Sequence, residues 1–105
     1  MTVAAPRHVR LWAFRVPPDR RADFERRYGP GGDWAALFAQ GAGWLGTELL
    51  ADAAEPGRYV TVDRWESAAA WDAFRARFAA EYEALDSECE SLGASEEMIG
   101  AFEER

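Results

Sequence analysis

The chain has 105 residues, a length that suits one domain and is too short for two. A content of 49% hydrophobic and 13% aromatic residues excludes a disordered chain, although 30% of the residues are charged. The formal net charge of -7 disfavours nucleic acid and anionic membranes as partners, because both are negatively charged themselves. We therefore expect a single folded domain over residues 1–105.

Some residue types with special chemistry are absent or occur once. Every basic residue is arginine, which excludes a Schiff-base lysine and a P-loop lysine. The single histidine, His8, and the single cysteine, Cys89, exclude a multi-histidine metal site, a cysteine zinc cluster and an intrachain disulfide. We expect neither a metal nor an organic cofactor.

Three features predict a cytoplasmic location. A lone cysteine is typical of a reducing compartment. Residues 1–6 lack the basic and apolar regions of a signal peptide. No apolar run approaches the roughly 20 residues of a membrane span.

The first predicted element is a strand over residues 9–16, which ends at Pro17 because proline has no amide hydrogen for a ladder. Both faces are apolar, as in a strand that is covered on both sides. Alternation places Val9, Leu11 and Ala13 on one face and Trp12, Phe14 and Val16 on the other. Two short helices are predicted next, over residues 19–28 and 33–40.

A hairpin is predicted from strands over residues 44–50 and 58–65, joined by the turn sequence Glu55-Pro56-Gly57. In its first strand, strict alternation places Leu45 and Leu49 opposite Trp44 and Leu50. In its second strand, one face carries Tyr59, Thr61, Asp63 and Trp65, and the other carries Val60, Val62 and Arg64.

The longest predicted helix begins after Ser67, a good N-cap, and ends near Leu92 before Gly93. Its apolar residues recur at steps of three and four: Trp71, Phe74, Phe78, Tyr82, Leu85, Cys89 and Leu92. A last, short strand is predicted over residues 97–102.

The order β-α-α-β-β-α-β predicts an α+β fold of the split βαβ, ferredoxin-like type. In this fold the helices cover one face of a four-stranded antiparallel sheet, and the other face is ordinarily polar. Here the first two strands are apolar on both faces. A second copy of the chain is the simplest cover, so we expect a homodimer with an interface on the order of 2,000 Å².

Three segments carry a resemblance to a known family. They are the strand ending in Phe14-Arg15-Val16-Pro17-Pro18, the segment Trp44-Leu45-Gly46-Thr47-Glu48-Leu49-Leu50, and the run from Tyr59 to Ser67 that leads into Ala70-Trp71-Asp72-Ala73-Phe74. Over nearly its whole length the chain resembles the antibiotic biosynthesis monooxygenase-like family of the dimeric α/β-barrel superfamily. The resemblance implies that two protomers form a dimeric α/β barrel. The family contains cofactor-independent oxygenases and haem-degrading enzymes.

One functional position of that family is matched. The tryptophan that lines the pocket of its oxygenase members corresponds to Trp65. The asparagine of the haem-degrading members falls near Phe14, and the chain contains no asparagine. Their haem-ligating histidine falls near Arg75. We therefore expect no specific haem binding.

We expect a binding cavity between the sheet and the helices, on the face of Asp63. The predicted catalytic residues are Asp63, as a general base, and Trp65, as a wall that stacks on a flat substrate. The predicted substrate-binding residues are Tyr59, Thr61, Phe74, Phe78 and Tyr82. Two structural alternatives remain open: Trp65 as a core residue, and Asp63 in an ion pair with Arg10 or Arg15.

Three functions are consistent with these residues. The first, implied by the resemblance, is a cofactor-independent monooxygenase acting on a small aromatic or polyketide-like substrate. The second is a non-catalytic, dimeric small-molecule-binding module of the same fold, which the missing asparagine and histidine favour. The third is an isomerase or lyase with Asp63 or His8 as its base.

Overall fold

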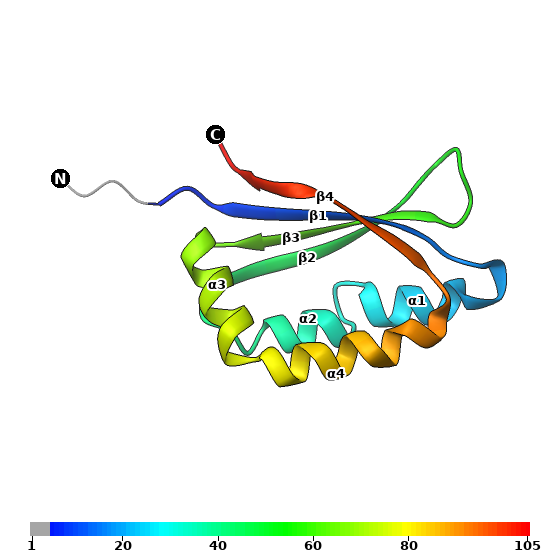
Figure 1. The fold of residues 1–105 in the computed structure, drawn as a ribbon. Helices are drawn as coiled ribbons and strands as arrows, with labels where there is room; N and C mark the ends of the chain where they lie inside the picture. The colour runs from blue at the N-terminus through cyan, green and yellow to red at the C-terminus, as the bar shows by residue number, and fades with distance from the viewer. Residues whose placement is uncertain (1–4) are drawn as a thin grey trace.

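The computed structural model describes residues 5–105 and contains a four-stranded antiparallel sheet with its helices on one face (Figure 1). The strands are β1 (His8–Arg15), β2 (Trp44–Ala51), β3 (Arg58–Trp65) and β4 (Ser95–Glu103). They lie in the order β2-β3-β1-β4. This arrangement confirms the predicted α+β, ferredoxin-like fold. Residues 1–4, which belong to the segment expected not to be a signal peptide, lie outside the described residues.

Two sets of helices lie beneath the sheet in Figure 1. Between β1 and β2 are the short 3-10 helix η1 (Pro18–Arg20), α1 (Arg21–Tyr28) and α2 (Asp33–Phe38). Between β3 and β4 are α3 (Ala68–Arg77), α4 (Ala79–Cys89) and the 3-10 helix η2 (Glu90–Leu92). None of the helices within residues 5–105 combines the length and the apolar character that a membrane crossing requires.

The long helix predicted from Ser67 to Leu92 is wrong in one respect, because the chain bends at Phe78. The N-cap is as predicted, since the Ser67 hydroxyl oxygen accepts a hydrogen bond from the Ala70 amide at 3.1 Å. Phe78 adopts φ -105° and ψ 27°, outside the helical region, while its ring stacks on Phe74. The bend lets α3 pack at one end of the sheet and α4 run beneath it beside α2 (Figure 1). Tertiary packing therefore sets the bend, because no proline or glycine marks it in the sequence.

The core between the sheet and the helices is dominated by aromatic side chains. Phe24 and Trp65 are its largest fully buried residues. The Phe24 ring stacks on Tyr28 with centroids 4.2 Å apart, and Trp65 lies 5.0 Å from Phe74. Each fully buried side chain of this size stabilises the fold by about 1.5–3 kcal/mol. These contacts fasten the helices to the sheet.

A β-bulge near the start of β2 changes the predicted alternation. Trp44 pairs with Trp65 and Gly46 pairs with Arg64, so Leu45 is the extra residue. Strict alternation predicted Trp44 on the face opposite Leu49, and that prediction is wrong. The bulge places Trp44 on the helix-covered face, together with Thr47 and Leu49.

Among residues 5–105, no helix covers the other face of the sheet (Figure 1). Val60 and Val62 lie on it, in the strand phase that the sequence predicted, and they pair with Ala13 and Leu11 of β1. Leu50, opposite Val60, is 51% exposed. This outer face of the sheet is therefore apolar and open in a single chain.

Candidate active site

A cavity of about 130 Å³ lies between the sheet and the helices. The sheet strands β1, β2 and β3 line it with Arg10, Trp12, Phe14, Thr47, Thr61 and Asp63. The helices line it with Tyr28, Trp34, Phe38, Trp71, Tyr82 and Asp86. Glu96 of β4 completes the lining and is exposed, and Asp86 is partly exposed. The cavity therefore opens between α4 and β4, while its far wall is the buried face of the sheet.

Asp63 is the buried carboxylate of this cavity. Its side chain is on the helix-covered face of β3, and the residue is 8% exposed. The Thr47 hydroxyl donates a hydrogen bond to Asp63 Oδ1 at 2.8 Å. Burial raises the pKa of Asp63 from 3.8 to about 6, although the Thr47 hydrogen bond and the charge of Arg10 oppose the rise. A carboxylate with this pKa suits the role of a general base near neutral pH.

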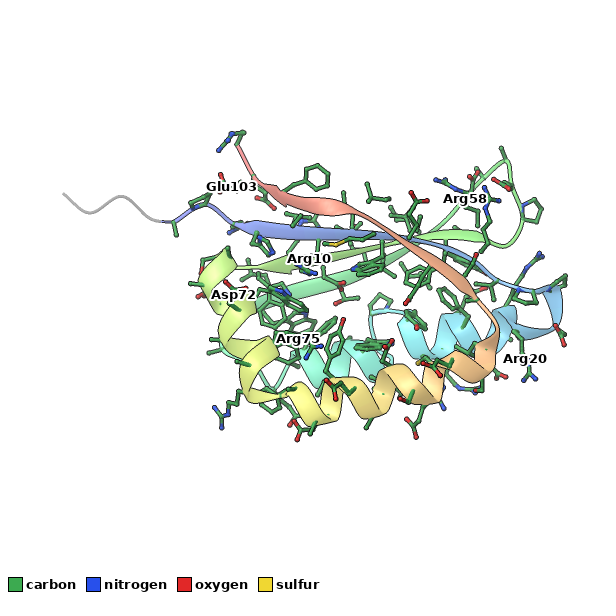
Figure 2. The ribbon with its side chains drawn as sticks, in the orientation of Figure 1. Arg10, Arg20, Arg58, Asp72, Arg75 and Glu103 are labelled. Carbon is green, nitrogen blue, oxygen red and sulfur yellow. The ribbon has the colours of Figure 1, made fainter. Side chains whose placement is uncertain are left out.

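Arg10 stands beside Asp63 in the sheet but forms no ion pair with it. The two residues are partners in the register of β1 and β3. The Arg10 guanidinium instead lies over the Trp71 ring, 4.1 Å from the ring centroid. Figure 2 shows Arg10 and Arg75 on the helix side of the sheet. Arg15 pairs with Glu55 in the hairpin. Within residues 5–105, the predicted alternative of an Asp63 ion pair with Arg10 or Arg15 is therefore wrong, because both guanidinium groups have other neighbours.

The helix side of the cavity is aromatic, with polar tips. Tyr28 and Tyr82 both line it, and burial is the main cause that raises the pKa of each phenol above its usual value. Both therefore stay neutral at physiological pH and keep a proton to donate. Trp34 is buried on the same wall, and its Nε1 has no hydrogen-bond partner among the described residues. The cavity thus offers flat apolar walls and a few hydrogen-bond donors, as ligand sites typically do.

The structure brings together only some of the residues predicted for the site. Thr61, Asp63 and Tyr82 line the cavity. Trp65 does not line it, because its ring is fully buried between Phe38, Trp71 and Phe74. Phe74 and Phe78 stack on each other in the same aromatic group, also outside the cavity lining.

Two further candidates lie outside the cavity. Tyr59 is on the correct face, but its hydroxyl donates a hydrogen bond to Glu25 Oε2 at 2.7 Å, away from the cavity lining. His8 is buried at the start of β1, and its Nε2 has no partner among the described residues. Burial and the nearby charge of Arg10 lower the pKa of His8.

Sequence reasoning missed Arg10 and Thr47 as site residues. Arg10 carried a usable signal, because alternation in β1 places it on the same face as Trp12 and Phe14. Thr47 carried none on its own, since its importance depends on its pairing with Asp63 across β2 and β3. Tyr28 and Trp34, from the two short helices between β1 and β2, also border the cavity.

Two other observations concern alternative kinds of site, a second hollow and a metal centre. A second hollow, of about 300 Å³, lies beside the end of β1 and is lined by residues including Arg15, Arg58 and Glu97. Asp63 does not line it. Within residues 5–105, no group of three or more His, Cys, Asp and Glu side chains is placed to hold a metal ion.

The fold and the aromatic cavity together define a small ferredoxin-like protein with a candidate ligand site between the sheet and the helices. The family model of the antibiotic biosynthesis monooxygenases matches residues 8–84, so the chain belongs to this family and the predicted resemblance is confirmed. A search of the curated proteins found no match.

Three solved structures illustrate the shared fold. SnoaB, a cofactor-independent oxygenase from Streptomyces nogalater, is 24% identical over 96% of this chain and 95% of its own, with a TM-score of 0.65. A candidate antibiotic biosynthesis monooxygenase from Deinococcus radiodurans is 16% identical over 93% and 92%, with a TM-score of 0.73. A conserved protein of unknown function from Bacteroides thetaiotaomicron is 17% identical over 96% and 100%, with a TM-score of 0.67. At these identities the likeness concerns the fold.

Proposed function

We propose that this chain is a cofactor-independent monooxygenase that oxidises a small, electron-rich aromatic or polyketide-like substrate. The observation that carries the proposal is Asp63, a buried carboxylate with a pKa raised to about 6, facing a cavity with aromatic walls. Such a group is mostly ionised at pH 7 and is a stronger base than an ordinary aspartate. Membership of the family and the fold shared with SnoaB favour oxidation over an isomerase or lyase reaction.

The proposed reaction uses one base, with molecular oxygen as the oxidant. Asp63 takes a proton from an activated CH₂ group of the substrate, and the aromatic ring delocalises the carbanion. The carbanion gives its electron pair to O₂ and forms a C–O bond. The proton returned by Asp63 then completes a hydroperoxide. Loss of the second C–H proton and cleavage of the O–O bond give a C=O group and one molecule of water.

The neighbours of Asp63 support this chemistry. Tyr28 and Tyr82 are neutral phenols that can donate hydrogen bonds to substrate oxygens. The positive charge of Arg10 favours the anionic substrate formed by proton removal. Trp34 provides a flat surface for an aromatic ring. In this proposal Trp65 acts indirectly, because it packs against Trp71 with ring centroids 5.5 Å apart.

Aerobic incubation with an anthrone that carries phenolic hydroxyls tests the proposal. We expect one O₂ molecule to be consumed for each quinone formed. An oxygen electrode measures the O₂ uptake, and the quinone absorbance measures the product. Asp63→Asn should lower kcat at pH 7.5 by at least about 100-fold. Asp19→Asn, the same change at an exposed position in η1, serves as the matched control and should leave kcat unchanged.

Two outcomes contradict the proposed function. One is O₂ uptake no faster than in buffer alone, and the other is full activity in Asp63→Asn. Quenching of tryptophan fluorescence by the anthrone, without O₂ uptake, would favour the alternative of a non-catalytic binding module. Trp12, Trp34 and Trp71 all line the cavity, so a bound aromatic ring has reporters close to it.

We further propose that the active form is a homodimer in which a second copy covers the outer face of the sheet. Two exposed apolar residues of the sheet, Leu50 and Phe102, support this proposal. Strand pairing places Leu50 and Phe102 on the outer face, beside Val60 and Val9. A face-to-face pair of such sheets is self-complementary, as a two-fold interface requires.

A cytoplasmic location completes the proposal. The one cysteine, Cys89, is buried and unpaired, a usage typical of proteins from reducing compartments. The net charge of -7 supports a partner that is a small molecule or a second copy rather than nucleic acid or an anionic membrane.

A further inference from the structure

A chain of two hydrogen bonds leads from the edge of the core to the proposed base. The Trp44 indole N–H donates to Thr47 Oγ1 at 3.2 Å, and the Thr47 hydroxyl donates to Asp63 Oδ1 at 2.8 Å. Thr47 and Asp63 are both buried, and they are partners in the register of β2 and β3. Trp44 joins the chain because the bulge at Leu45 places it on the same face.

The order of donors fixes the direction of the Thr47 hydroxyl. A threonine hydroxyl has one proton to donate and two lone pairs that accept. The indole N–H of Trp44 has no acceptor capacity, so Thr47 must accept from it. The hydroxyl proton of Thr47 is then free to point at Asp63 Oδ1. The other oxygen of Asp63, Oδ2, accepts no hydrogen bond among the described residues. It is also not one of their fully buried side-chain atoms that lack a hydrogen-bond partner.

We propose that Thr47 and Trp44 are positioning residues that hold Asp63 by Oδ1 and leave Oδ2 as the oxygen that takes the substrate proton. This inference rests on the proposed role of Asp63 as the base. Thr47 orients the carboxylate and favours its ionised form, because the hydrogen bond is strongest to the charged oxygen. Trp44 acts one step further away, by preventing the Thr47 hydroxyl from rotating toward other acceptors.

Other charged and titratable groups around Asp63 stay constant when Thr47 or Trp44 is changed. They are Arg10 of β1, Tyr28 of α1, Arg75 of α3, Tyr82 and Asp86 of α4, and Glu96 of β4. None of these groups hydrogen-bonds Thr47 or Trp44 in the described residues. A change in the titration of Asp63 in the variants therefore reports the loss of this hydrogen-bonded chain.

The test is the pKa of Asp63 in the full-length protein, measured by NMR with aspartate labelled with ¹³C at the side-chain carboxyl. Thr47→Val keeps the shape and removes the hydroxyl, so we expect the pKa to rise by about one unit, tenfold in the ionisation constant. Trp44→Phe should raise it by a smaller amount, because Thr47 keeps its hydroxyl but loses its fixed direction. Thr47→Ser should restore the wild-type value. The matched control is Thr61→Val, a buried cavity threonine without a hydrogen bond to Asp63, which should leave the pKa unchanged.

Turnover of the anthrone provides the second readout. In Thr47→Val, the acidic limb of the kcat profile should move up by the same unit, while Thr47→Ser follows the wild type. An unchanged pKa in both Thr47→Val and Trp44→Phe overturns the inference, whatever the activity. A raised pKa in a protein that never consumes O₂ supports the positioning role and rejects the oxygenase function, so the two failures are distinguishable. Should Thr47→Val fail to fold, Trp44→Phe and Thr47→Ser decide the question alone.

Discussion

The two faces of the sheet are built from the same strands and are both mainly apolar, but they differ in whether their polar side chains are buried. The inner face, toward the helices, buries Thr47, Thr61 and Asp63 among aromatic rings. The outer face is mainly aliphatic, and it leaves Leu50 and Phe102 about half exposed. Its ion pair between Arg64 and Glu48 lies near solvent. The inner face thus surrounds a buried carboxylate, whereas the outer face keeps its charges exposed to solvent.

This difference indicates what each face is for. Burial raises the pKa of Asp63 even though Thr47 and Arg10 favour its charged form, so this carboxylate lowers the stability of the folded state at neutral pH. A contiguous patch of exposed aliphatic residues on a sheet is typical of a surface that binds another surface. Under the proposed function the inner face serves chemistry and the outer face serves assembly, so substitutions on one should leave the other largely intact.

The largest expected effect is on the aromatic group that supports the inner face. Trp65→Ala removes a fully buried indole and leaves a cavity, so we expect the free energy of unfolding to fall by about 3–5 kcal/mol. Chemical denaturation measures this loss. Trp12→Phe, a smaller change on the cavity lining itself, serves as the comparison. A change below about 1 kcal/mol in Trp65→Ala would show that Trp65 is a ligand contact rather than a support.

The fold and the face of β3 could be predicted from the sequence because both follow from alternation. A period of two placed Thr61 and Asp63 together, and the register confirms that phase. Alternation failed at Leu45, where a bulge reverses the faces of β2. This is why Trp44 was not recognised, whereas the importance of Thr47 depends on its pairing with Asp63 across β2 and β3.

Other features depend on packing that no local pattern encodes. The position of Trp65 on the correct face did not reveal that Phe38, Trp71 and Phe74 seal it from the cavity. The bend at Phe78 has no proline or glycine to announce it. The long Arg10 side chain can reach several neighbours, so its stacking on Trp71 does not follow from the sequence pattern.

The second prediction separates assembly from the site. Leu50→Glu places a charge on the outer face, where the residue is 51% exposed in a single chain. In the proposed dimer this carboxylate would be buried twice, so the dissociation constant should rise at least about 100-fold, or about 3 kcal/mol. Sedimentation equilibrium measures the change. Ala76→Glu, an exposed position on α3, adds the same charge on the helix side and should leave the association unchanged. Identical association in both variants would place the interface elsewhere.

The third prediction concerns the stability cost of Asp63. Because its folded-state pKa is raised from 3.8 to about 6, the folded protein binds the proton more tightly than the unfolded chain. Stability from this group is complete below pH 3.8 and is lost as pH rises through about 6. Asp63→Asn should therefore raise the free energy of unfolding at pH 7.5 by about 1–3 kcal/mol, with little difference at pH 3.5. Urea denaturation at the two pH values checks the expectation, and a variant less stable than the wild type at pH 7.5 contradicts it.

The smallest expected effect is that of the same Asp-to-Asn substitution at a position in contact with solvent. Asp23 on α1 pairs with Arg26 at 2.8 Å, and the exposed fractions of the two side chains are 41% and 71% respectively. Asp23→Asn should change the free energy of unfolding by less than about 0.5 kcal/mol, because solvent screens an exposed pair. Its urea denaturation curves at pH 7.5 and pH 3.5, read beside those of Asp63→Asn, give the contrast directly. If Asp23→Asn shifts stability with pH as strongly as Asp63→Asn, the effect comes from the change in net charge and not from burial on the inner face. If only Asp63→Asn shows the shift, burial of that one carboxylate is the cause, and the folded protein is less stable for keeping it.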